Sequence, residues 1–194
     1  MFKNFNIRIF LYFFAFLIVS EGCAPVKCVY YEPIASSGKL FVKDSAIIGP
    51  KDRIEFLFSN TKITITGYST GIYLVVLIPK GESIRFGSDE LEWHPSSSLT
   101  WIKTKFFLEF YDPGKPDGVC QVRPIDNLIQ GYDSKLSYHG PESGIYENTI
   151  KLDKIKRDHY FVRMPAILIN SHVYEIPVIE FIKREGFGIF PINV

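Results

Sequence analysis

The stretch TKITITGYSTGIYLVVLIP, residues 61–79, decides the fold class. In its first seven residues Ile63 and Ile65 alternate with threonines, which is the period-2 pattern of a strand with one buried face. Residues 68–71 are rich in glycine, serine and threonine and predict a turn. Residues 72–79 are apolar on both faces, which indicates a central strand covered on both sides. The stretch therefore predicts two neighbouring strands of one sheet.

Short strand patterns recur along the rest of the chain after residue 38. They lie at residues 39–43, 52–58, 83–86, 91–93, 100–111, 160–169, 172–176, 178–183 and 189–194. The 12 prolines and 14 glycines separate these patterns, and the 11 tyrosines and 17 phenylalanines favour pleated structure. We therefore expect an all-β fold: a single antiparallel β-sandwich, immunoglobulin-like in broad style, after an N-terminal signal helix.

The expected domain covers residues 39–194 and follows a tether at residues 23–38, where Pro25 and Pro33 oppose a helix. Residues 112–159 are the least regular part, so we interpret them as a loop-rich insertion. Binding residues concentrate on loops held by a rigid scaffold, which makes this insertion the expected place for a functional surface.

The N-terminal segment predicts export. Lys3 and Arg8 precede an uncharged apolar run at residues 9–19, and Ser20-Glu21-Gly22 then leads into Cys23. This order is typical of a secretory signal peptide, which we place at residues 1–22. The apolar run has 11 residues, whereas a helix needs about 20 to span the hydrocarbon core.

Three interpretations of the end of this segment stay open. The Gly22–Cys23 junction resembles a bacterial lipoprotein signal, in which cleavage before the cysteine lets it carry lipid. The absence of Asp at Ala24 then points to the outer membrane, by resemblance to enterobacterial sorting. Alternatively, an ordinary signal peptidase cuts after Gly22, because Ser20 and Gly22 are small. The third interpretation is an uncleaved interfacial anchor helix. We favour lipidation of Cys23, because the cysteine lies directly at the expected cut.

The three cysteines, Cys23, Cys28 and Cys120, are an odd number for an exported chain. Lipid on Cys23 leaves Cys28 and Cys120 to form a disulfide in the oxidising periplasm. The alternative is two unpaired buried thiols. Neither cysteine belongs to a Cys-x-x-Cys pair, so we expect no metal and no cofactor.

The net charge of the chain bears on whether nucleic acid is a partner. Without residues 1–22 the chain carries 20 basic and 20 acidic residues. A net charge of zero argues against nucleic acid, whose phosphates demand a basic patch. It also gives no electrostatic attraction to an anionic membrane face.

Two serine motifs match enzyme signatures without their structural context. Gly67-Tyr68-Ser69-Thr70-Gly71 matches the Gly-x-Ser-x-Gly of α/β-hydrolases, but a strand follows it where that chemistry needs a helix. Ser36-Ser37-Gly38-Lys39 matches the Ser-x-x-Lys of penicillin-binding proteins, but we expect a turn there. Glu90, Glu92 and His94 alternate on one strand face, which we interpret as a polar surface in preference to a metal site. We therefore expect no enzyme.

The closing segment carries Tyr174-x-x-Pro177-x-Ile179-x-Phe181 and then Gly188-Ile189-x-Pro191-Ile192-Asn193. It resembles the C-terminal pattern of uncharacterised proteobacterial lipoproteins. The resemblance implies a location and a fold class, and no activity.

We expect a non-enzymatic cell-envelope lipoprotein, held at the membrane by lipid on Cys23, that acts as a structural or interaction module. Its expected partners are the membrane and an envelope protein or a glycan. One alternative is a periplasmic glycan- or peptide-binding module that uses exposed aromatic residues: Trp93, Trp101, Tyr132 and Tyr138. The other is a secreted soluble domain without lipid.

Overall fold

The computed structural model describes residues 23–42, 48–111, 119–125, 128–131, 143–152 and 158–191. The expected all-β class is confirmed, because every regular element in this part of the chain is a strand and every strand pair is antiparallel. Within the described residues, no helix has the length and apolar character needed to cross a membrane. The expected signal peptide at residues 1–22 lies outside them.

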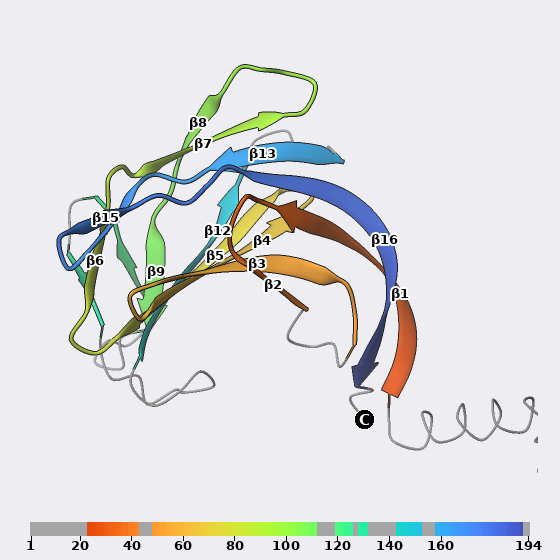
Figure 1. The fold of residues 1–194 in the computed structure, drawn as a ribbon, viewed down its shortest axis with the longest axis horizontal. Coiled ribbons are helices and arrows are strands. Elements are labelled where there is room, and N and C mark those ends of the chain that lie inside the picture. The colour runs from red at the N-terminus through yellow and green to blue at the C-terminus, as the bar shows by residue number, and fades with distance from the viewer. Residues whose placement is uncertain are drawn as a thin grey trace, which may run out of the picture.

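Twelve strands form one large sheet that curls into a half-barrel (Figure 1). They are β1 (Cys23–Ile34), β2 (Lys39–Val42), β3 (Lys51–Phe58), β4 (Thr61–Tyr68), β5 (Gly71–Pro79), β7 (Glu90–Pro95), β8 (Ile102–Lys105), β9 (Leu108–Tyr111), β10 (Val119–Val122), β12 (Ser143–Lys151), β13 (His159–Arg163) and β16 (Ile179–Pro191). The order is β10-β9-β12-β5-β4-β1-β16-β13-β7-β8. The sheet forks beside β4, because β3 pairs with residues 61–66 and β1 meets the same edge at Gly67.

Four shorter strands form a second sheet in the order β11-β6-β14-β15. They are β6 (Ser83–Phe86), β11 (Ile129–Gln130), β14 (Ile167–Ile169) and β15 (His172–Tyr174). The two sheets share one apolar core: Phe86 of the small sheet meets Phe106 edge-on at 5.5 Å between ring centres, and Tyr174 lies 5.0 Å from Phe58. An immunoglobulin-like sandwich is not confirmed, since one sheet has twelve strands and the other four.

The hairpin expected within residues 61–79 is confirmed as β4 and β5. Ile63, Ile65, Leu74 and Val76 are fully buried, as the alternation requires. The hydroxyl of Tyr160 in β13 lies 3.1 Å from the backbone oxygens of both Tyr68 and Gly71, so β13 contacts the turn of this hairpin through one buried side chain.

The expected tether at residues 23–38 is wrong for most of its length. Strand β1 runs from Cys23 and pairs with β16 residue by residue, from Cys23 with Pro191 to Ile34 with Glu180. Prolines are tolerated in β1 because its other edge bonds to β4 at one position, Tyr31 with Gly67. Residues 23–34 are therefore part of the sheet, ahead of the domain start expected at residue 39.

Two segments expected as single strands are split between partners. Residues 100–111 form β8 and β9, and the break at Phe106 lets its amide bond to the carbonyl of Asp89 at 2.8 Å and its ring enter the core. Residues 160–169 form β13 in the large sheet and β14 in the small one, because Pro165 interrupts the pairing. Conversely, β16 continues unbroken through residues 186–188, where the glycines predicted a break between two strands.

The loop-rich insertion expected at residues 112–159 contains part of the sheet. Strand β12 pairs with β5 along nine residues and with β9 on its other edge, so it is an interior strand of the large sheet. Its alternation is hard to see in the sequence because Gly144 and Asn148 occupy two positions of the face that also carries Tyr146 and Ile150.

Candidate ligand-binding groove

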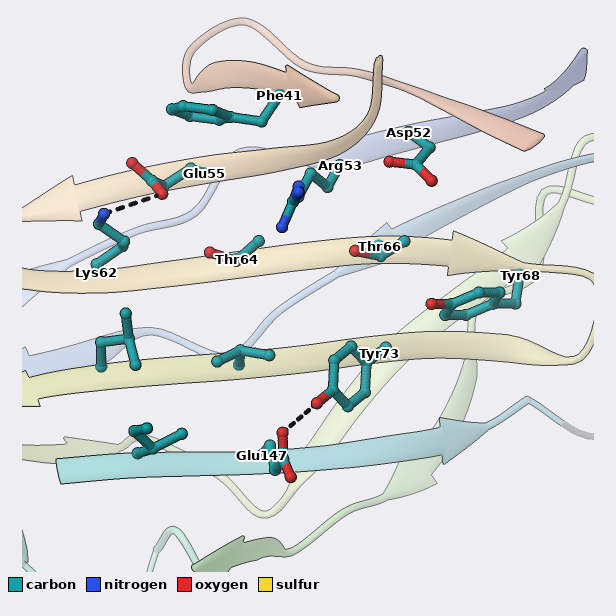
Figure 2. Close-up of a pocket in the computed structure, with 13 residues that line it drawn as sticks. Phe41, Asp52, Arg53, Glu55, Lys62, Thr64, Thr66, Tyr68, Tyr73 and Glu147 are labelled. Carbon is teal, nitrogen blue, oxygen red and sulfur yellow. Dashed lines mark hydrogen bonds and ion pairs between the residues drawn. The ribbon is translucent and has the colours of Figure 1, made fainter. Parts of the chain in front are cut away.

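A groove of about 420 Å³ lies on the face of the large sheet that points away from the core (Figure 2). Apart from Asp52, the lining residues of β3, β4, β5 and β12 alternate with the core residues, so the period-2 geometry of the strands puts one set inside and the other in the groove. The floor consists of Thr64 and Thr66 of β4, Val75 and Leu77 of β5 and Ile145 of β12.

Three aromatic rings stand along the groove (Figure 2). Phe41 reaches over it from β2, while Tyr68 and Tyr73 come from β4 and β5. Tyr68 is 41% exposed at the end of the groove. Tyr73 donates its hydroxyl hydrogen to the Glu147 carboxylate across the strand boundary, which fixes the ring beside an acceptor group.

Arg53 holds the β2 side of the groove in place. Its guanidinium donates from Nε to the backbone oxygen of Val42 at 3.0 Å, and its Nη2 donates to the same oxygen. Val42 follows Phe41 directly, so this contact positions the Phe41 ring over the groove. Arg53 is thus a structural support as well as a lining residue.

The charges in the groove nearly balance. Two cations, Arg53 and Lys62, face three carboxylates, Asp52, Glu55 and Glu147. Lys62 and Glu55 form an ion pair at 3.4 Å. The groove therefore has no strong field of either sign and suits a polar ligand with little net charge.

A second cavity of about 310 Å³ adjoins the groove where the sheet forks. Asp52 and Tyr68 line both spaces, and β1 and Pro50 form the far wall of the second. Burial and the neighbouring Asp52 carboxylate raise the pKa of Tyr68 above its ordinary value of 10.0, so its hydroxyl stays protonated at neutral pH and is available as a donor. The two cavities therefore share Asp52 and Tyr68 as wall residues.

The two tryptophans expected to form an aromatic binding surface do not line the groove. Trp93 is only 3% exposed and belongs to the core, with its indole N–H donating to Thr104 Oγ1 at 3.1 Å. Trp101 is half-buried: the Arg163 guanidinium lies 4.0 Å from its ring centre and the His94 ring packs on it edge-on. Tyr132 and Tyr138 lie outside the described residues.

The cysteine predictions have different outcomes. Cys23 is the first residue of β1, and its lipidation stays a prediction. Cys28 and Cys120 are thiols and form no disulfide with one another. Strands β4, β5, β12 and β9 lie between β1 and β10 in the sheet, so the two side chains start from distant strands. The disulfide prediction rested on the odd number of cysteines in the sequence, and that number does not determine which strands are neighbours.

The candidate polar face of β7 carries ion pairs. Glu92 accepts from Arg163 at 2.8 Å, Glu90 lies 3.4 Å from Lys103, and His94 is buried against two aromatic rings. Across the described ranges no three His, Cys, Asp or Glu side chains gather as metal ligands. Ser69 lies in the turn between β4 and β5, as expected for an ordinary hairpin.

Sequence reasoning missed the groove residues Phe41, Tyr68 and Tyr73. The available signal was the second face of the hairpin, where Thr64, Thr66 and Tyr68 alternate with the buried isoleucines. We interpreted residues 72–79 as covered on both sides, whereas their second face is half-buried because it forms the floor and side of an open groove.

No family model matches the chain, and searches of curated proteins and of solved structures find none that is significantly similar.

Proposed function

We propose that this protein is a non-enzymatic binding module of the bacterial cell envelope, attached to the membrane by lipid on Cys23, and that the groove binds a glycan. The observation that carries the proposal is the combination of aromatic rings, hydroxyls and carboxylates along one open sheet face. A sugar ring offers an apolar C–H face that packs on an aromatic ring, and a rim of hydroxyls that need both donors and acceptors.

The groove supplies each of these groups in a fixed position. Tyr68 and Phe41 offer ring surface at its ends, and Thr64 and Thr66 offer hydroxyls on the floor. Glu147 offers a carboxylate oxygen beside the bound Tyr73 hydroxyl. Hydrogen bonds from neutral hydroxyls to a carboxylate are stronger than those between neutral groups, which favours a ligand rich in hydroxyls.

An extended peptide fits less well. Peptides commonly bind by adding a strand to an open sheet edge, where main-chain groups are unpaired. The strands under the groove already have neighbours on both sides: β4 pairs with β3 and β5, and β5 pairs with β12. Recognition in the groove must therefore come from side chains, which is the mode that glycans use.

The envelope location rests on the sequence. The lipoprotein-like junction before Cys23 supports it, and so does the position of Cys23 as the first residue of β1, because lipid there attaches directly to the folded sheet. A singly acylated chain binds membranes marginally, so a stable anchor requires more than one acyl chain on that cysteine.

The test is an array of soluble and immobilised envelope glycans and peptides, probed with a Cys23→Ser chain. We expect binding to glycans that Tyr73→Ser abolishes or weakens by roughly tenfold, the effect of about 1.4 kcal/mol. Val173→Ser is the matched control, because Val173 is exposed on the small sheet. Binding to peptides only, or glycan binding that Tyr73→Ser leaves unchanged, would contradict the proposal.

A further inference from the structure

The paired strands β1 and β16 end in an exposed apolar face. Cross-strand partners point to the same side of an antiparallel pair, and alternate residues of one strand share a side. The register pairs Pro25 with Ile189 and Lys27 with Phe187, and a separate bridge pairs Ile48 with Ile189. One side therefore carries the ribbon-end face, made up of Pro25, Val29, Ile48, Phe187 and Ile189.

This face is open in spite of its composition. Phe187 is 73% exposed, Ile48 62% and Val29 57%. The same side of the ribbon continues inward to Tyr31 and Phe181, which are buried in the core, so the face is the extension of the core side beyond the core. Lys27 lies opposite Phe187 and Glu185 opposite Val29, so the apolar side chains share this side with one charged pair. Exposed apolar groups gathered in this way commonly mark an interaction site.

The position of the N-terminal segment indicates what covers the ribbon-end face. The apolar run at residues 9–19 ends four residues before Cys23, a chain length of at most about 14 Å. Pro25 follows two residues after Cys23. With the membrane attachment proposed above, either lipid on Cys23 or the apolar run itself would hold the start of β1 at the bilayer surface, next to the ribbon-end face.

We propose that the ribbon-end face rests on the lipid bilayer, with Phe187 and Val29 inserted at the level of the headgroups. The proposal rests on the membrane attachment proposed above and adds a contact made by the folded domain. Charge on this side comes from Lys27 and Glu185, which pair with one another at 2.7 Å, and from Lys183, which pairs with Asp158 at 2.9 Å. Binding is therefore driven by apolar burial and is insensitive to salt.

The contact would also orient the domain. Figure 1 shows β1 and β16 curving away to one end of the molecule, while β6 and β15 lie at the opposite side. With the ribbon end on the bilayer, the small sheet points away from the membrane. The domain would be held by two neighbouring attachments, the anchor and the face, instead of swinging on one.

The experiment places a tryptophan on the face of the full chain. Phe187→Trp and the control Val173→Trp are each extracted from membranes and reconstituted in phosphatidylethanolamine–phosphatidylglycerol vesicles containing a brominated lipid. The wild type gives the background from Trp93 and Trp101. We expect a blue shift and bromine quenching of Phe187→Trp above that background, unchanged by added salt, and no extra quenching of Val173→Trp. Val29→Trp replaces Phe187→Trp if the latter does not fold.

Quenching of Phe187→Trp no greater than that of Val173→Trp would overturn the proposal. So would a blue shift that depends on protein concentration without quenching, because a second copy would then cover the face. The intact mass of the same samples reports the anchor separately. Acylation without quenching rejects the face and keeps the anchor, whereas quenching without acylation keeps the face and rejects the lipid.

Discussion

The hydroxyl of Tyr160 lies 3.1 Å from the backbone oxygen of Tyr68, one of two residues that line both the groove and the adjoining cavity. Tyr160 belongs to β13, and in the sheet order β1 and β16 lie between β13 and β4. The contact therefore ties the groove end of the hairpin to the far side of the curl, and it links the stability of the half-barrel to the shape of the groove.

Removing this hydroxyl should weaken the fold. Tyr160→Phe removes the one hydroxyl hydrogen that the backbone oxygens of Tyr68 and Gly71 share, and losing this hydrogen bond should lower the free energy of unfolding by about 0.5–1.5 kcal/mol. Urea denaturation followed by fluorescence measures the change. A free energy equal to that of the wild type would show that the hydroxyl does not hold the turn.

Gly67 should not accept a side chain. A Cβ there would lie 2.4 Å from Cδ1 of Phe181 and 2.9 Å from the Tyr160 hydroxyl, both inside the core. We expect Gly67→Ala to lower the free energy of unfolding by about 1–3 kcal/mol through overpacking. Gly87→Ala is the matched control, since its Cβ would meet the Ala166 oxygen at 3.4 Å, and its free energy should lie within about 0.5 kcal/mol of the wild type.

Glu82 should make the fold sensitive to acid. Its carboxylate accepts from Ser59 Oγ at 2.8 Å, Thr61 Oγ1 at 2.7 Å and both nitrogens of Asn60. Burial alone raises the pKa of Glu82, but these four hydrogen bonds outweigh it and lower the pKa below its ordinary value of 4.5. The carboxylate thus binds the turn between β3 and β4 to the start of β6.

A lowered pKa in the folded state means that the stabilisation is present above the unfolded pKa of 4.5 and is lost as the pH falls through the folded value. Glu82→Gln should therefore be less stable than the wild type at pH 7, and the difference should shrink toward pH 3. Urea midpoints at both pH values measure it. Glu90→Gln, in an ion pair on the surface, should change little. A constant difference across the range would contradict the role of the charge.

The sequence predicted the strands that have a clean alternation and missed those that lack one. Residues 61–79 predicted the central hairpin because isoleucine and threonine alternate there, and the strand expected after Gly-Tyr-Ser-Thr-Gly is present as β5. Strand β12 was not predicted, because glycine and asparagine occupy inward positions where a regular alternation would have apolar side chains. Pairing partners depend on the tertiary fold, so the disulfide between Cys28 and Cys120 could not be judged from the spacing.

The groove shows the same limit for function. Its residues come from β2, β3, β4, β5 and β12, and the close approach of these strands follows from the fork beside β4. Trp93 and Trp101 drew attention because tryptophan is rare, yet one is in the core and the other is packed under Arg163. Threonine on the outward face of β4 is common in sheets, so that pattern alone does not indicate a site.

The thiols give a separate check of the strand order. In a Cys23→Ser chain denatured without reductant, an alkylating reagent should add to both Cys28 and Cys120, and prior reduction should not change the mass. In the native protein Cys28 should react first, because it is half-buried while Cys120 is 7% exposed. A chain that accepts the reagent only after reduction would show a disulfide and contradict this sheet order.

The most direct measurement of the central claim is a map of the bound glycan by amide chemical shifts, using the best ligand from the array. We predict that the shifts gather along the groove, at Phe41, Thr64, Thr66, Tyr73 and Glu147, and that they disappear in Tyr73→Ser. Shifts that gather instead around Trp101, Phe161 and Arg163, with the groove unchanged, would show that the ligand binds the aromatic surface over β7 and β13. The assignment of the groove as the binding site would then be wrong.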